Sequence, residues 1–133
     1  MASFFTSSYA GTILSNLFSG AYIGLSTSTP TDTGTNITEP GTSAGYARVA
    51  ASTGGMTVTD GTITNQNYIY YPESTASWGT VTYLFLSSSS SVGTTGSTVR
   101  YIGELTSSVA IGADTVPLFR PGALSVTITD ASA

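Results

Sequence analysis

Short runs in which apolar and polar residues alternate fill most of this chain after residue 20. The clearest run is residues 123–129, where Leu124, Val126 and Ile128 are separated by serine and threonine. Because successive side chains of a β-strand point to opposite faces, this alternation predicts a strand with one buried face. Gly, Pro and Asp punctuate the runs, as turns require. The sequence therefore predicts an all-β fold, an antiparallel β-sandwich of jelly-roll or immunoglobulin-like type, with a small barrel as the alternative.

The predicted strands are short and differ in how their apolar residues are placed. Residues 79–86 are apolar on both faces, which is typical of a strand at the centre of a sandwich. In residues 99–105, Arg100 and Glu104 fall on the face opposite to Tyr101. The full set of predicted strands is residues 21–26, 46–50, 56–59, 67–71, 79–86, 99–105 and 123–129.

Residues 1–20 follow a different pattern. Between residues 8 and 19, apolar side chains recur at helical spacing, namely Ile13, Leu14, Leu17 and Phe18. Ser8 fits the N-cap of a short helix, and Gly20 fits the position just past its C-terminal end. We therefore expect residues 1–20 to be an N-terminal helical contact segment and residues 21–133 to form a single β-sandwich domain.

The side chains that enzymes use most often are missing from the sequence. The chain has no histidine, cysteine or lysine, and only 8% of its residues are charged. Proton transfer, nucleophilic attack and transition-metal binding depend largely on those side chains. We therefore expect no enzyme activity, no cofactor and no metal site, and interpret the chain as one that folds, packs and associates.

Charge narrows the possible partners. The net charge is −4, and Arg48, Arg100 and Arg120 are the only basic side chains. Binding to nucleic acid or to an anionic membrane surface needs a basic cluster, and no apolar run is long enough for a transmembrane helix. We expect neither nucleic acid nor membrane as a partner. Weak self-repulsion permits close association with other proteins and with further copies of the chain.

Two weak chemical signals remain. The chain has seven carboxylates, and two of them facing each other across a cleft would make a glycosidase. Most of them, however, adjoin Gly, Pro or Thr in predicted turns. The pattern Asp32-x-Gly34-x-Asn36 resembles part of a calcium loop but lacks the further oxygen ligands. We interpret both signals as turn chemistry and keep the glycosidase as a remote alternative.

Two predicted connections are longer than usual. Residues 27–45 are polar and contain Pro30 and Pro40, whose fixed φ angles reduce the entropy lost on ordering. We interpret this loop as a contact arm, with both prolines and Asp32 as candidate partner-binding residues. Residues 87–98, rich in serine and glycine, are interpreted as a flexible hairpin tip.

Arg48 lies in a nearly uncharged region of the sequence. If its side chain is buried, it needs a carboxylate partner, for which Glu39 and Glu73 are the candidates. The alternative is a solvated arginine on a strand face. Glu39 and Arg48 are also candidate partner-binding residues.

A cluster of aromatic residues gives the remaining candidates. On a strand, Tyr68 and Tyr70 share one face while Ile69 and Tyr71 take the other, so we expect one pair in the core and one exposed. Exposed tyrosines suit a protein interface or a sugar-stacking platform. The other interpretation is that all of them cover the ends of the sandwich. The aromatic candidates for partner contact are Phe4, Phe5, Tyr68 and Tyr70.

The order of several short segments resembles a known family. The segments are YIGLS at 22–26, GYARV at 45–49, SWGTVT at 77–82, YIGEL at 101–105 and FRPGALSV at 119–126. From about residue 13 to residue 130, this ordered set resembles small virion proteins of tailed bacteriophages, often labelled tail fibre proteins.

The resemblance implies a non-enzymatic virion structural protein, assembled in the cytoplasm of the host bacterium. It implies either a capsid decoration (cement) protein or a fibre-base subunit on the head or tail surface. The expected partners are the major capsid or tail proteins and further copies of the chain, with a trimer as the first expectation for the homo-oligomer. The alternative is a receptor- or carbohydrate-binding module at the tail tip.

Overall fold

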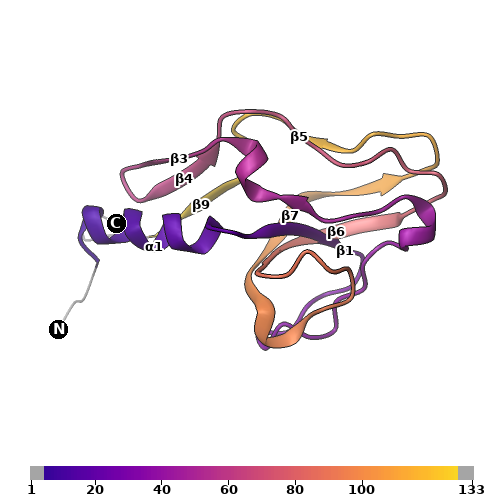
Figure 1. Ribbon diagram of the computed structural model, residues 1–133, viewed down its shortest axis with the longest axis horizontal. Coiled ribbons are helices and arrows are strands. Elements are labelled where there is room, and N and C mark those ends of the chain that lie inside the picture. The colour runs from indigo at the N-terminus through magenta and orange to yellow at the C-terminus, as the bar shows by residue number, and fades with distance from the viewer. Residues whose placement is uncertain (1–4, 129–133) are drawn as a thin grey trace.

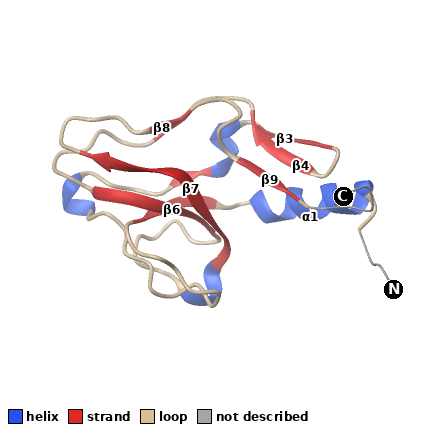
Figure 2. Cartoon of the chain, turned by 180° about the vertical axis from the view of Figure 1, so that it is seen from behind, coloured by secondary structure: helices blue, strands red, loops and turns tan. Residues whose placement is uncertain are grey.

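The computed structural model describes residues 5–128, which form one α-helix followed by short antiparallel strands (Figures 1 and 2). The elements are α1 (Ser7–Phe18), β1 (Tyr22–Ser26), β2 (Val49–Ala50), β3 (Met56–Thr59), β4 (Thr62–Asn65), β5 (Ile69–Tyr70), β6 (Gly79–Ser87), β7 (Val99–Ile111), β8 (Leu118–Phe119) and β9 (Ser125–Thr127), with single 3-10 turns at Thr42–Ala44, Ala51–Gly54 and Gly96–Thr98. The predicted all-β antiparallel sandwich with a short N-terminal helix is confirmed.

Helix α1 has its N-cap two residues earlier than the sequence predicts. Thr6, not Ser8, is the N-cap, and its hydroxyl accepts a hydrogen bond of 3.3 Å from the N–H of Tyr9. Gly20 follows the helix with a φ of +62°, as predicted for the position past its end. The side chains that α1 buries are Ala10, Leu14 and Phe18. No helix in the described residues is long and apolar enough to cross a membrane.

A four-stranded sheet in the order β2-β1-β6-β7 is the largest layer of the fold. Strand β6 lies inside this sheet, as its two apolar faces predict. The three-stranded sheet β3-β4-β9 and the pair β5-β8 lie on one side of it, whereas a lobe of loops lies on the other (Figure 1). Helix α1 packs against β3 and β4.

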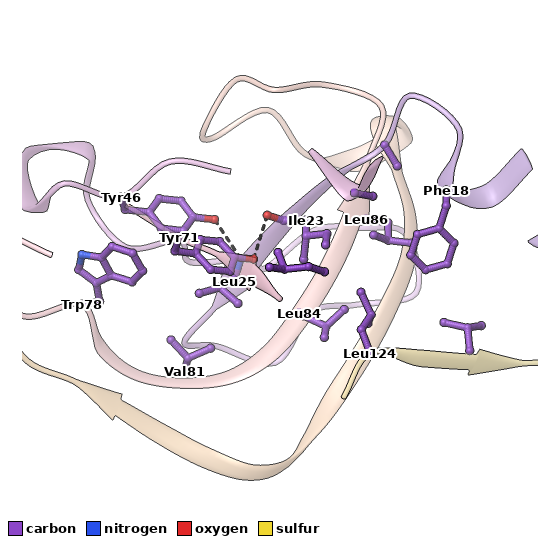
Figure 3. Packing of buried hydrophobic residues seen from close by; sticks show 14 of the residues in the cluster. Phe18, Ile23, Leu25, Tyr46, Tyr71, Trp78, Val81, Leu84, Leu86 and Leu124 are labelled. Atoms are coloured by element: carbon purple, nitrogen blue, oxygen red, sulfur yellow. Dashed lines mark hydrogen bonds between the residues drawn. The ribbon is translucent and has the colours of Figure 1, made fainter. Parts of the chain in front are cut away.

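The core lies between the layers and combines aliphatic with aromatic side chains (Figure 3). The indole ring of Trp78 meets the ring of Tyr46 edge-on at 5.2 Å, and its N–H donates to the carbonyl oxygen of Ala44 at 2.9 Å. The Tyr71 hydroxyl donates to the carbonyl oxygen of Ile23 at 3.1 Å. Burying these rings therefore leaves no polar atom of theirs without a partner, as a stable core requires.

Several strand boundaries differ from the predicted ones. The strand predicted at residues 46–50 is reduced to the two residues of β2. The N–H of Leu25 on β1 donates to the Tyr46 hydroxyl at 2.9 Å, and not to a backbone carbonyl of a longer neighbouring strand. Strand β7 continues beyond residue 105 to Ile111, paired with the start of β6 across an irregularity in register. The sequence does not predict β4 or β8, and β5 and β9 are shorter than predicted.

Candidate interaction site

The two long loops fold against each other into one exposed lobe. We call residues 28–38 and 88–98 together the loop tip; it is the lobe below the four-stranded sheet in Figure 1. Within the first loop, the Ser28 hydroxyl donates to the carbonyl oxygen of Asn36 at 2.7 Å. Between the loops, the Gly96 N–H donates to the carbonyl oxygen of Gly34 at 2.8 Å. The backbones of the two loops are thus bonded directly to each other.

A buried ion pair lies at the base of the loop tip. The Nε and Nη2 atoms of Arg48 donate to Oε1 and Oε2 of Glu39 at 2.9 and 2.8 Å. The side chains of Arg48 and Glu39 are 0% and 4% exposed. This two-point geometry fixes both side chains as well as joining opposite charges. Of the two carboxylates considered for Arg48, Glu39 is the partner, and the alternative of a solvated arginine is wrong.

The same two side chains also bind the second loop. Arg48 donates from Nη1 to the carbonyl oxygen of Ser89 at 2.8 Å and from Nη2 to that of Thr94 at 2.9 Å. Glu39 Oε2 accepts the N–H of Gly93 at 2.7 Å. The sequence predicts a flexible hairpin tip here, whereas the structure fixes this loop at three points to a buried ion pair.

An aromatic ring supports the ion pair from the sheet side. The guanidinium carbon of Arg48 lies 5.0 Å from the ring centre of Phe85 on β6, a cation–π contact. The Phe85 ring in turn lies over Gly24 of β1, where any Cβ atom would collide with it. Strands β1 and β6 therefore carry the platform on which the loop tip is built.

Hydrogen bonds keep Glu39 ionised. Burial alone would raise its pKa, but hydrogen bonds from Arg48, the Gly93 N–H and the Tyr46 hydroxyl, together with the positive charge of Arg48, outweigh this effect. The pKa of Glu39 therefore lies below its ordinary value. Burial, with the charge of Glu39 as a further cause, raises the pKa of Tyr46 and Tyr71, so both phenols stay neutral donors.

The predicted partner-binding residues of the first loop divide into a buried and an outer group. Pro40 and Arg48 are buried, as is the side chain of Glu39, so these residues support the loop from inside. Asp32 is exposed at the outer turn, and Pro30 is partly exposed beside it. Only the outer group is placed to touch another protein directly.

The calcium-like pattern of the first loop forms a turn. The Asn36 amide donates to the carbonyl oxygen of Thr29 at 2.8 Å, and Thr31 and Thr35 share a hydroxyl contact of 2.6 Å. Within residues 5–128, no three acidic side chains gather in a way that could hold a metal ion. Local hydrogen bonds therefore account for the pattern.

Tyr68 and Tyr70 form a second exposed feature. Ile69 and Tyr71 are buried, while Tyr68 and Tyr70 are 48% and 56% exposed, which confirms the predicted division into a core pair and an outer pair. The outer rings stack with centres 5.8 Å apart at an angle of 15°. Leu118 of β8, also exposed, lies directly opposite Tyr70.

The remaining aromatic candidates lie at the N-terminal end. Phe5 is exposed and its ring centre lies 6.2 Å from that of Tyr9, on the first turn of α1. Phe4 lies outside the described residues.

Sequence reasoning missed the part that Phe85 and the second loop play in this site. The carbonyl oxygens of Ser89 and Thr94 carry no signal in the sequence, because any residue offers a carbonyl. For Phe85 the sequence does hold a signal. Phe85 is the one aromatic residue of residues 79–86 that pairs with a glycine, Gly24, on the neighbouring strand, and a glycine leaves space for a ring.

Residues 9–127 match the family described as Podophage GP4 fiber I protein gp80. The chain belongs to this family of phage fibre proteins. It is therefore a structural component of a bacteriophage virion. No match to the chain is found among curated proteins.

Proposed function

We propose that the chain is a non-enzymatic fibre-base subunit that attaches to the shell or tail of the particle through its loop tip. Membership of a phage fibre family supports a structural role in which the protein binds other virion proteins. The observation that carries the choice of surface is the Arg48–Glu39 pair, which holds two exposed loops in one arrangement.

A loop that is ordered before binding loses less conformational entropy when it binds. The outer face of the first loop is polar and nearly uncharged, with Asp32 as its one acidic side chain and threonines at positions 31, 33 and 35. Such a surface suits hydrogen bonding to another folded protein, and in many copies even weak contacts of this kind add up to stable attachment.

A homo-oligomer forms part of the same proposal. Repetition around a symmetric particle multiplies each contact, and the low net charge of −4 opposes association between copies only weakly. A capsid decoration protein would use the same loop tip. The two roles therefore differ in the virion protein that the loop tip binds, and not in the surface that does the binding.

Incorporation into particles tests the proposal. Asp32→Arg adds a long cation at the outer turn without touching the buried ion pair, so we expect a folded subunit that is lost from purified particles. Glu73→Arg makes the same charge change at an exposed position outside the tip and serves as the control. Normal incorporation of the Asp32→Arg protein would argue against attachment through the tip.

The stacked Tyr68–Tyr70 pair supports a second candidate function, carbohydrate or receptor binding at the tail tip. Exposed aromatic faces stack well on sugar rings. Replacing both tyrosines with serine, as Tyr68→Ser and Tyr70→Ser, is expected to abolish any glycan-array binding while leaving incorporation intact. An absence of binding by the unmodified protein would exclude this candidate for the glycans tested.

A further inference from the structure

Within residues 5–128, the large apolar side chains that remain exposed fall into two groups. Phe5, just before α1, and Tyr9, in its first turn, form one group. The other group surrounds the pair β5-β8 and the second half of β7, and consists of Tyr68, Tyr70, Val109, Val116 and Leu118. Exposed apolar side chains that gather in this way commonly mark a surface that binds another protein.

The second group borders a groove between β7 and the segment that leads into β8. The groove has a volume of about 150 Å³. Its lining includes the buried side chains of Leu25, Val81 and Ile111 and the exposed side chains of Val109 and Leu118. None of the described residues that line it is charged. The groove is therefore an apolar site that opens to the surface.

A bulge in β7 accompanies this groove. Between the pairs Val81–Val109 and Tyr83–Glu104, β6 has one residue, 82, whereas β7 has four, 105–108. Extra residues on one strand bend it and interrupt its pairing. On the other side of the groove, the N–H of Tyr71 donates to the carbonyl oxygen of Pro117 at 2.9 Å, which fixes the segment before β8. The groove thus lies between the bulged strand and this fixed segment.

The groove has the size and chemistry of a site for one aromatic ring. An apolar cavity of about 150 Å³ is large enough to hold a benzene molecule. Phe5 carries an exposed ring of that size, and residues 5–20 contain no charged side chain. Neither surface therefore has to lose the hydration of a charge when the two meet.

The two surfaces lie too far apart to meet within one molecule. Helix α1 begins at one end of the long axis, whereas β7 runs toward the other end as it approaches Ile111 (Figures 1 and 2). We propose that Phe5 and Tyr9 of one copy dock into the groove beside β7 of the next copy. Because two different surfaces meet, the copies join head to tail and do not close as a twofold dimer.

The two aromatic rings have different parts in this contact. Their centres lie 6.2 Å apart at an angle of 35°, so they form one projection at the start of α1. The ring of Phe5 is wholly apolar and enters the groove. The ring of Tyr9 covers the exposed side chains of Val109 and Leu118, with its hydroxyl toward water, as suits an aromatic ring with a polar end.

This inference names the contact between copies that the proposed homo-oligomer requires, and in that respect it rests on the proposed function. The loop tip projects from the side of the long axis and not from its ends (Figure 1), so copies joined head to tail keep it free for attachment. The tests below use the isolated full chain, so their failure would leave attachment through the loop tip untouched.

Mixing two variants tests the head-to-tail contact. The ring variant carries Phe5→Ser and Tyr9→Ser and keeps the groove, whereas the groove variant carries Val109→Glu and keeps both rings. In analytical ultracentrifugation we expect each variant alone to associate about tenfold or more weakly than the unmodified chain, because an aromatic side chain is left unburied. Mixed together, they should form a one-to-one complex with the affinity of the unmodified chain, since the rings of one fit the groove of the other.

A twofold contact predicts no such rescue, because it would need the same surface on both partners. A mixture that associates no better than the single variants would overturn the proposal, as would an unmodified chain that stays monomeric at high concentration. Ser90→Glu adds the same charge on the loop tip and should associate as the unmodified chain does. Circular dichroism shows whether each variant is folded, and Leu118→Glu, at another exposed residue of the groove, replaces Val109→Glu if the latter is unfolded.

A spin label gives an independent test, because the chain has no cysteine of its own. A nitroxide on Ser8→Cys, an exposed position in the first turn of α1, should broaden the methyl NMR signals of Val109 and Leu118 in an isotope-labelled copy without the nitroxide. The same nitroxide on Ser90→Cys, in the loop tip, should leave these signals sharp. Equal broadening by both labels, or none by the label at residue 8, would contradict the docking of α1 in the groove.

Discussion

Arg48 joins parts of the chain that are far apart in sequence, with hydrogen bonds to residues 9, 41 and 46 positions away. The sequence indicates that such an arginine needs a carboxylate if it is buried, because an isolated buried charge is too costly. It narrows the choice to Glu39 and Glu73 but cannot decide between them, since the decision depends on how the first loop folds back. The backbone carbonyls that complete the site are invisible to sequence reasoning.

Replacing Arg48 with an uncharged residue should destabilise the folded protein. Arg48→Met leaves Glu39 buried without a positive partner and frees the carbonyl oxygens of Ser89 and Thr94. We expect the free energy of unfolding to fall by about 3–5 kcal/mol, measured by urea denaturation. The control is Arg120→Met, because Arg120 is exposed and makes no side-chain ion pair in the described residues. A loss below 1 kcal/mol for Arg48→Met would contradict the structural importance of the pair.

Low pH should lower the free energy of unfolding, because Glu39 becomes protonated. Its pKa is lower in the folded than in the unfolded state, so the folded state binds fewer protons, and stability falls as pH falls. The contribution is complete above the unfolded pKa of about 4.3 and is lost as pH drops through the lower folded value. Urea unfolding between pH 7 and pH 3 should show this loss. Glu39→Gln should flatten the acid part of the curve, whereas Glu73→Gln should not; identical acid slopes for both would refute the assignment.

Among the secondary-structure elements, the hairpin β3-β4 turns at a two-residue motif, Asp60-Gly61, that is visible in the sequence. Asp60 and Gly61 both have positive φ values, +49° and +77°, as a two-residue hairpin turn requires. An Asp-Gly pair after an alternating run is typical of a hairpin turn, yet the strand on its far side, β4, is not among the strands predicted from the sequence. Strand β8 gives no such signal, because it consists of Leu118 and Phe119 alone. The far half of β7 is hidden for another reason, since its serines show no apolar alternation.

The contact between β1 and β6 should tolerate no added atom at Gly24. A Cβ there would lie within the ring of Phe85, which is fully buried and supports Arg48 from below. We expect Gly24→Ala to lower the midpoint of thermal unfolding, at a cost of about 1–3 kcal/mol from overpacking. Gly112→Ala, where an added Cβ meets nothing within 4 Å, is the matched control. Equal stability of the two variants would contradict the packing described here.

At the scale of the whole molecule, the sequence predicts the fold class and the family better than it predicts the interaction site. Alternation and turn residues specify strands and their faces locally, so an antiparallel sandwich follows from them. The loop tip depends instead on contacts between residues 28–38 and 88–98, which no local pattern encodes. The predicted contact residues accordingly include both outer positions such as Asp32 and buried ones such as Pro40.

We propose that this virion protein works by occupying a place in an assembly, attached through the loop tip. The most direct measurement is a cryo-electron microscopy map of the purified particle at a resolution that traces the chain. We expect residues 28–38 and 88–98 to be covered by another virion protein in every copy. A loop tip that faces solvent while a different surface holds the chain on the particle would contradict it.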